Sequence, residues 1–395
     1  MISVAEALER VLALAAPLET ESVPLAQGVG RVLREKVVAR RSQPPFAASA
    51  MDGYAVAGDV VRPGATFTVI GQAAAGHGFA GRVGRGEAVR IFTGAPLPEG
   101  ADHVVIQEDV TRQGGNITLL ENVGAGANVR APGCDFRAGA ELSAPRRLRP
   151  ADLALIAAMN VAELHVTRRP VVALIATGDE LVMPGEAPGP DQIIASNSFA
   201  LQAMVAQEGA EARLLPIARD DAESLRTVFA LAEGADVIVT IGGASVGDHD
   251  LVGPVAQSLG MERAFYKVAM RPGKPLMAGR LGTAALLGLP GNPVSAIICG
   301  QLFLLPLLRA MQGLEAGPPK RLRARLACDL PANAAREHYM RARLSDNGAE
   351  MPDISPFDSQ DSALLSVLGE ADALLVRPPE DPPRRAGDTV ACIPL

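Results

Sequence analysis

The feature that most constrains the fold is a regular alternation of strand-like and helix-like segments between residues 170 and 311. Apolar runs such as VVALIA (171–176) and DVIVTI (236–241) are separated by helical patterns of about 10 to 15 residues. Strands separated by helices of this length form βαβ units, in which the strands run parallel. We therefore expect a central, doubly wound α/β domain with a mostly parallel sheet, a class that binds ligands where its strands end.

Three turns in this region are rich in small residues and follow apolar runs. They are ATGDEL (176–181), TIGGASVGDHD (240–250) and LGLPGNPVSA (287–296), and the basic segment KVAMRPGKP (267–275) precedes the last of them. The carboxyl ends of parallel strands share one edge of the sheet, and glycines there let backbone N–H groups approach an anion. Acids, bases and bare backbone should converge on this edge, which indicates a metal-assisted site for a phosphorylated ligand.

The rest of the chain predicts further domains around the α/β domain. Glycines and β-formers dominate the segment before residue 141, with a hairpin-like turn at RQGGN (112–116), and the alternation RLRARLACDL (321–330) indicates strands near the C-terminus. The predicted units are a helix in 1–20 that packs on the α/β domain, a linking domain of 21–46 and 142–166, a Gly-rich β domain of 47–141, the α/β domain of 167–318, and a small β-barrel-like domain of 319–395.

Composition argues against several classes of protein. The net charge of −7 lacks the basic surface of a nucleic-acid-binding protein, and the four cysteines have no CxxC spacing, so neither a zinc site nor a disulfide framework is expected. The most apolar stretch, 294–311, is interrupted by Gln301 and Pro306 and is predicted to be a buried helix rather than a membrane span. Ser3 and Glu6 predict a capping box on an N-terminal helix rather than a signal peptide, so we expect a cytoplasmic protein.

Seven segments stand in an order that resembles one enzyme family. They are PPFAASAMDGYAV (44–56), RIFTGAPLPEGADHVVIQED (90–109), GANVRAPGCDF (126–136), ATGDEL, TIGGASVGDHD, RPGKP (271–275) and LPGNPVSA (289–296). The order is that of molybdopterin molybdenumtransferases, which are similar to the gephyrin E domain. The resemblance implies an elongated homodimer that takes adenylylated molybdopterin and molybdate, releases AMP with the help of Mg²⁺, and leaves molybdenum on the dithiolene.

The acids at the predicted strand ends have two readings. Asp179 and Glu180 could cap a helix and fill its first turn, which is common after a strand. The resemblance assigns Glu180 to the site and leaves Asp179 open between capping and function. The glycines and serine before Asp248 and Asp250 suit a backbone anion nest with an acid at its exit, and the alternative is a flexible glycine loop. We expect Asp250 to contact the pterin or metal, whereas His249 is interpreted as an ordinary loop histidine.

The lysines are informative because only four of the 37 basic residues are lysine. Two of them, Lys267 and Lys274, flank Arg271, and a compact ammonium suits a phosphate or molybdate oxygen. The alternative is that Lys267 lies on a strand surface and Lys274 in a solvated loop. We expect both to bind oxyanion charge. Arg271 departs from the lysine that is frequent in the family at its position.

The Gly-rich β domain supplies a second set of candidates through the resemblance alone. Asp52 and Thr93 would otherwise be ordinary turn residues, and Arg130 and Asp135 are brought together only by a tight turn. The resemblance implies that all four face the α/β domain of the other subunit, so that the active site forms across the dimer. Ala131 and Cys134 stand where arginine and glutamate are frequent in the family.

The complete assignment follows from the turns and the resemblance together. Asp52, Glu180, Asp220 and Asp250 are the expected Mg²⁺ ligands, because Mg²⁺ prefers carboxylate oxygens. The expected catalytic residues are Asp52, Thr93, Glu180, Asp250, Lys267, Arg271 and Lys274. The expected substrate-binding residues are Arg130, Asp135, Gly242, Gly243, Ser245, Gly247, Pro290, Gly291, Asn292, Pro293 and Ser362, of which Arg130 and Ser362, together with Thr93, would help to position molybdate.

Two other functions fit parts of the pattern. An adenylyltransferase that makes adenylylated molybdopterin would need only the α/β domain, and this chain carries three further domains. A non-catalytic scaffold similar to gephyrin is disfavoured by the intact set of acids. The resemblance further implies contact with the adenylyltransferase that supplies the substrate, and with recipient molybdoenzymes or their chaperones.

Overall fold

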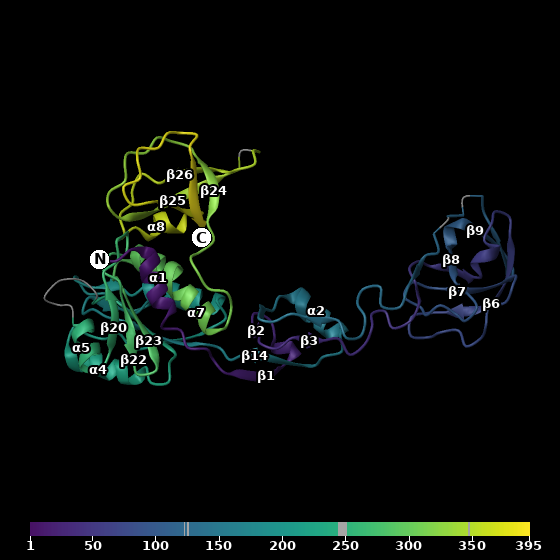
Figure 1. The fold of residues 1–395 in the computed structure, drawn as a ribbon, viewed down its shortest axis with the longest axis horizontal. Helices are drawn as coiled ribbons and strands as arrows, with labels where there is room; N and C mark the ends of the chain where they lie inside the picture. Colours follow the sequence, from purple (N-terminus) through teal and green to yellow (C-terminus); the bar gives the residue numbers. More distant parts are fainter. Residues whose placement is uncertain (122, 125, 244–250, 347) are drawn as a thin grey trace.

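The computed structural model describes residues 1–121, 123–124, 126–243, 251–346 and 348–395, and Figure 1 shows an elongated molecule. The α/β unit and a C-terminal β unit pack together at one end. A small linking unit lies in the middle, and a glycine-rich β unit lies at the far end. The multi-domain α/β plus β class predicted from the sequence is confirmed.

The α/β unit is built on one sheet with the strand order β18-β15-β19-β23-β22-β20. Its first four strands are parallel and the last two are antiparallel to their neighbours. The strands are β15 Val171–Ala176, β18 Glu211–Leu214, β19 Val237–Ile241, β20 Glu262–Tyr266, β22 Met277–Leu281 and β23 Ala284–Leu289. Helices cover both faces of the sheet, as in a doubly wound fold, and an apolar core lies between the sheet and the helices on each face. The helices are α3 Asn197–Gln207, α4 Ala222–Leu231, α5 Val252–Ser258, α6 Pro293–Cys299 and α7 Leu305–Met311.

One strand of this sheet differs from the sequence expectation. The apolar run AFYKVAM (264–270) predicts a single strand, but β20 ends at Tyr266 and the additional strand β22 returns alongside it. Lys267 has φ +71°, a left-handed conformation that cannot continue a strand. The chain therefore leaves the sheet at Lys267, and residues 267–276 form an excursion closed by the bond from Lys267 N to Leu276 O at 2.9 Å.

Two further helical regions pack on this unit. α1, Val4–Leu12, buries Val4, Ala7, Leu8 and Val11 in the same core as α7. Only half of the expected capping box forms: Ser3 accepts from Glu6 N at 3.1 Å, while the Glu6 carboxylate binds Arg10. In the described part of the chain, 293–311 is the one helix long and apolar enough to cross a membrane, and 72% of it is buried inside the fold. A π-helical segment, Gly300–Leu304, joins its two halves.

The linking unit has its own small core and is joined to the α/β unit by charge. Its sheet has the order β1-β14-β2-β13 beside the pair β12-β3, and Glu208 at the end of α3 accepts from Arg147 at 2.5 Å and from Arg309 at 3.0 Å. Its elements are β1 Thr20–Pro24, η1 Leu25–Gln27, β2 Val32–Leu33, β3 Val37–Val38, β12 Glu141–Leu142, β13 Arg146–Arg147, α2 Pro150–Ala158 and β14 Glu163–Thr167.

The far unit is a six-stranded sheet with the order β8-β5-β7-β6-β10-β9, beside the pair β11-β4. Gln113 pairs with Asn116 across Gly114 and Gly115, so the hairpin expected at RQGGN is confirmed. The elements are β4 Ala48–Ser49, β5 Gly53–Val56, η2 Gly58–Val60, β6 Thr66–Ala73, β7 Glu87–Ile91, β8 His103–Ile106, η3 Gln107–Asp109, β9 Val110–Gln113, β10 Asn116–Leu119 and β11 Val129–Arg130.

The C-terminal unit is a small barrel, as expected, because β25 pairs with both β26 and β27. It is fused to the α/β unit in two ways: Tyr339 and Ile393 belong to the α/β core, and β21, Met270–Arg271, pairs with β25. Its elements are β24 Leu322–Leu326, β25 Glu337–Ser345, β26 Asp353–Pro356, α8 Leu365–Gly369, β27 Ala373–Arg377 and β28 Thr389–Pro394.

Candidate functional site

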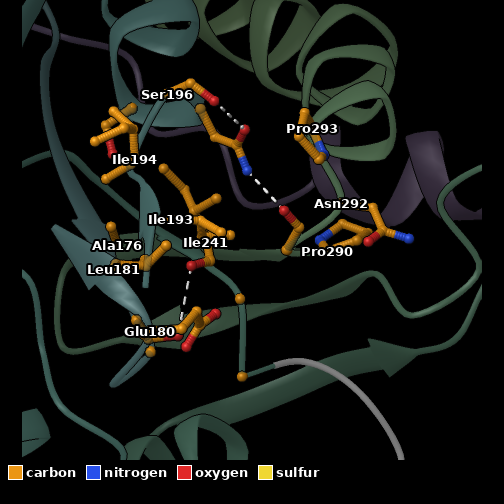
Figure 2. Close-up of a pocket in the computed structure, with 18 of the residues that line it drawn as sticks. Ala176, Glu180, Leu181, Ile193, Ile194, Ser196, Ile241, Pro290, Asn292 and Pro293 are labelled. Carbon is orange, nitrogen blue, oxygen red and sulfur yellow. Dashed lines mark hydrogen bonds between the residues drawn. The ribbon is translucent and has the colours of Figure 1, made fainter. Parts of the chain in front are cut away.

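The first cavity, of about 590 Å³, lies at the carboxyl ends of β15, β19 and β23 (Figure 2). Thr177 and Gly178 follow β15, Gly242 and Gly243 follow β19, and the turn 290–293 follows β23. An apolar wall faces them, formed by Leu181, Ile193 and Ile194 from the short strand pair β16 Leu181–Val182 and β17 Ile193–Ile194. The structure thus brings these predicted turn residues to one cavity: Glu180, Asp220, Gly242, Gly243, Pro290, Gly291, Asn292 and Pro293.

Only glycine fits at the turn after β19. Gly242 has φ +98°, and a Cβ there would lie 2.7 Å from the Thr177 carbonyl oxygen. Gly243 has φ +60°, and its Cβ would lie 2.5 Å from a Val252 methyl group. The Gly242 N–H already donates to Leu289 O at 3.0 Å, so this donor serves the sheet rather than a bound anion.

Three predicted residues of the same turn, Ser245, Gly247 and Asp250, lie outside the described residues. The neighbouring turn 290–293 is held by Asn197 in α3, whose amide donates to Gly291 O at 2.7 Å. Asn197 was missed in the sequence, because an asparagine near a helix start is ordinarily interpreted as a cap.

Glu180 and Asp220 are exposed carboxylates at the edge of the first cavity. Asp179 is not a helix cap, because β16 rather than a helix follows it; its carboxylate lies 3.7 Å from the Arg219 guanidinium. Among the described residues, no group of three or more His, Cys, Asp or Glu side chains is placed to hold a metal ion. Two carboxylates nevertheless suit Mg²⁺, which keeps several waters and commonly binds one or two carboxylates plus substrate phosphates.

A second cavity of about 740 Å³ adjoins the first and shares Asn292 and Pro275 with it. It brings together cationic, hydroxyl and carboxylate groups from the α/β unit and the barrel. The Asn292 amide donates to Ser362 Oγ at 2.9 Å, which joins the two units between the cavities. The polar lining residues are Arg271, Lys274, Asn292, Ser295, Arg336, His338, Asp358, Ser359, Gln360, Asp361 and Ser362.

His338 and Arg336 in this cavity were not predicted. Arg271 in β21 pairs with His338 in β25, so docking of the barrel places the imidazole beside the RPGKP loop. Burial lowers the pKa of His338 to about 4, and the positive charges of Arg271, Arg377 and Arg336 contribute to the shift. The imidazole is therefore neutral at pH 7. The sequence offered one indication that Arg336 and His338 act together: residues two apart in an extended chain point to the same side.

Lys267 does not share a cavity with Arg271 and Lys274. Neither cavity is lined by it. Its ammonium lies 5.0 Å from the centre of the Tyr266 ring, and its carbonyl accepts from Ile2 N at 3.3 Å. The left-handed backbone at Lys267 directs the chain out of the sheet. The neighbouring Val268 N donates to Lys274 O at 3.0 Å, so the two backbones are adjacent, although the Lys267 side chain lines neither cavity.

The far β unit carries the other predicted residues. Asp52 Oδ1 accepts from both N and Oγ1 of Thr93 at 2.7 Å, and these bonds, together with the charge of Arg90, lower the pKa of the Asp52 carboxyl. Arg130 and Asp135 line a third cavity of about 640 Å³.

The β unit that carries Asp52 and Thr93 and the α/β unit that carries the first two cavities lie at opposite ends of the molecule (Figure 1). Asp135 lies nearer the linking unit, because its N donates to Gln43 O at 3.0 Å. Within one chain, therefore, the structure assembles two separate parts of the predicted site.

Comparison with known proteins identifies the family. Family models described as the MoeA N-terminal region (domain I and II), the probable molybdopterin binding domain and the MoeA C-terminal region (domain IV) match residues 2–160, 173–310 and 323–395. A molybdopterin molybdenumtransferase of Nostoc sp. is 35% identical over 371 residues, which are 91% of this chain and 85% of the relative. The chain belongs to the molybdopterin molybdenumtransferase family.

Further members of the family agree in sequence and fold. The molybdopterin molybdenumtransferase of Haemophilus influenzae is 32% identical over 96% of this chain and 95% of its own length. The crystal structure of a molybdopterin biosynthesis MoeA protein from Pyrococcus horikoshii OT3 superimposes with a TM-score of 0.83 at 27% identity and covers 100% of both chains. The likeness therefore extends over all four units rather than the α/β unit alone.

Proposed function

We propose that the chain transfers molybdenum from molybdate to adenylylated molybdopterin, with release of AMP. The observation that carries this proposal is the pair of adjoining cavities, one bearing Glu180 and Asp220 at the strand ends and the other bearing Arg271, Lys274 and Arg336. A pterin with a phosphate chain needs an apolar wall beside an acidic, metal-compatible edge, and an oxyanion needs cations. Membership of the family supplies the identity of the substrates.

The two cavities divide the work of binding. The pterin lies against the apolar wall and the turns of the first cavity, and Arg271 and Lys274 in the second hold phosphate or molybdate charge, with Ser362 beside them. Glu180 and Asp220, with Asp250 and a partner-contributed Asp52, are the residues that would hold Mg²⁺. When bound, the ion neutralises charge on the pyrophosphate.

The chain's own groups act by position and charge. Water attacks the phosphoanhydride, the P–O bond to AMP breaks, and AMP leaves while the phosphate stays on the pterin. The two dithiolene thiols bind the molybdenum of molybdate as two of its oxygens leave as water, which takes up the thiol protons and two protons from solvent. No side-chain nucleophile is needed, because orientation and fixed positive charge around the phosphates account for catalysis of this type. Lys267 lines neither cavity. We propose that it acts through contact with the bound substrate or with the partner subunit.

The activity is tested with the purified chain, molybdate and adenylylated molybdopterin. We expect AMP release in proportion to molybdenum bound, and its loss on chelation of Mg²⁺. A parallel reaction with ATP and metal-free molybdopterin tests the adenylyltransferase alternative. ATP consumption there, with no AMP release in the first reaction, would contradict the proposal.

We further propose that the active unit is a homodimer in which the β unit of one subunit completes the site of the other. This follows from the separation of the β unit, which carries Asp52 and Thr93, from the cavities of the α/β unit within one elongated chain. Light scattering at micromolar concentration should give the dimer mass. A monomer that is fully active would contradict the proposal.

Mixed dimers give a sharper test of the shared site. Asp52→Ala and Lys274→Ala should each fold normally and each be inactive alone. In a mixed dimer one of the two sites combines the intact β unit of one chain with the intact α/β unit of the other. Random mixing should restore about a quarter of the parent activity, whereas sites within single chains would give none.

The protein is proposed to act in the cytoplasm, to receive substrate from a molybdopterin adenylyltransferase, and to deliver product to molybdoenzymes or their chaperones. The apolar helix 293–311 supports a location away from membranes, because its fold buries most of it. Fractionation of cells that express the chain, followed by crosslinking in the soluble fraction, tests location and partners together.

A further inference from the structure

We propose that Arg90 is a positioning residue for Asp52: its guanidinium ties together the two segments of the β unit that present Asp52 and Thr93. The inference rests on the proposed function, because it takes Asp52 to act in molybdenum transfer. Arg90 lies in β7 and pairs with Tyr54 in the neighbouring strand β5. β5 begins at Gly53, the residue after Asp52.

The guanidinium lies near two aromatic rings that belong to the two segments. Arg90 Cζ is 5.0 Å from the centre of the Tyr54 ring and 4.9 Å from the centre of the Phe92 ring. Tyr54 is two residues after Asp52, and Phe92 immediately precedes Thr93. Because a planar cation is attracted to both ring faces, one side chain contacts the flanks of both segments.

Hydrogen bonds from the same group fix the backbone around Asp52. Arg90 Nη1 donates to Gly53 O at 3.2 Å, and Nη2 donates to Gln107 Oε1 at 2.6 Å. Gln107 N in turn donates to Asp52 O at 3.1 Å. The carbonyl groups of two consecutive residues, Asp52 and Gly53, are therefore held by Arg90 directly or through Gln107.

The backbone behind Asp52 has no room to adjust. A Cβ at Gly53 would lie 2.0 Å from the Val105 carbonyl oxygen, so this segment is packed tightly against β8. Both bonds from Thr93 end on Asp52 Oδ1, and among the described residues no donor is bonded to Oδ2. One oxygen is thus used to orient the carboxylate, and the other is left for a ligand.

This role requires arginine rather than positive charge alone. A guanidinium can stack on two rings while donating in its plane to two separate acceptors, whereas a lysine ammonium is a single point of charge without a plane. We therefore expect Arg90→Lys to lose the positioning although the charge is kept.

The test measures AMP release with adenylylated molybdopterin and molybdate in single turnovers with enzyme in excess. Arg90→Lys should lower the maximal rate roughly tenfold to a hundredfold, with little change in the substrate concentration that gives half the rate. Gln107→Ala, an exposed substitution, should give a smaller loss of the same kind and keeps the test available should Arg90→Lys not fold. Arg112→Lys, on the exposed strand β9 of the same unit, is the matched control and should match the parent.

A double variant separates positioning from general stability. If Arg90 acts through Asp52, then Arg90→Lys combined with Asp52→Asn should be no slower than Asp52→Asn alone. Losses that multiply, or an Arg90→Lys variant with parent kinetics, would overturn the inference. Parent activity in Asp52→Asn would instead show that the proposed role of Asp52 is wrong, which is a different failure.

Discussion

The tight contact between the ends of β15 and β19 makes a prediction that contrasts two glycines of one cavity. Gly242→Ala places a methyl group 2.7 Å from the Thr177 carbonyl oxygen and requires alanine at φ +98°. Gly291 lines the same cavity. The Cβ of Gly291→Ala would lie 3.5 Å from Gly242 Cα, which is an ordinary van der Waals contact. The two variants add the same methyl group and differ in backbone strain.

The cost can be estimated from these contacts. Alanine in a sparsely populated left-handed conformation costs on the order of 1 to 3 kcal/mol, and the short contact to a backbone oxygen must be relieved by moving a strand end. For a unit of about 150 residues, each kcal/mol lowers the melting temperature by roughly 2 to 4 °C. We therefore expect a fall of roughly 2 to 12 °C in Gly242→Ala and a change of less than about 2 °C in Gly291→Ala.

Calorimetry measures the melting temperature of the α/β unit with its barrel. The rate of AMP release measures whether the first cavity still binds and orients the substrate. A strand end displaced by about an ångström should lower the rate of Gly242→Ala by as much as a hundredfold. Equal melting temperatures in the two variants would refute the reasoning, because they would mean that the turn after β19 does not hold Gly242 in a left-handed conformation against Thr177.

Three further predictions concern charged and titrating groups. Lys274→Arg should lower the insertion rate roughly tenfold to a hundredfold at unchanged melting temperature, with Lys320→Arg as the silent control; kinetics within about twofold of the parent would return Lys274 to a solvated loop. His338, with a folded pKa of about 4 below its ordinary value of 6.5, stays neutral while the unfolded chain takes up a proton, so stability should fall by about 3 kcal/mol as pH drops from 6.5 to 4. His338→Gln should remove that part of the pH dependence of urea midpoints. Glu208→Gln leaves two partly buried arginines without their counterion and should cost about 2 kcal/mol in urea unfolding, whereas Glu211→Gln, on the exposed start of β18, should cost almost nothing.

The sequence determined the fold of the α/β unit and the position of its first cavity. Apolar runs separated by helical patterns specify βαβ units, and the carboxyl ends of parallel strands meet at one edge for geometric reasons alone. The order of strands and turns along the chain is therefore enough to place Glu180, Gly242 and the turn 290–293 together. Local turn chemistry likewise determined the Gly114–Gly115 hairpin.

Tertiary structure alone decided the rest of the site. The chain leaves the sheet at Lys267, where φ is +71°, and Lys267 does not line the cavity that holds Arg271. The meeting of Arg271 with His338 depends on β21 pairing with a strand more than sixty residues away. Local propensity carries no information on such pairings, because their free energy comes from the apolar core that the barrel shares with the α/β unit. The distance of Asp52 from the cavities is set in the same way, by how the linking unit docks on the α/β unit through Glu208. Local sequence around Asp52 carries no information on this distance, and only the resemblance of the whole set of motifs to a family indicated it.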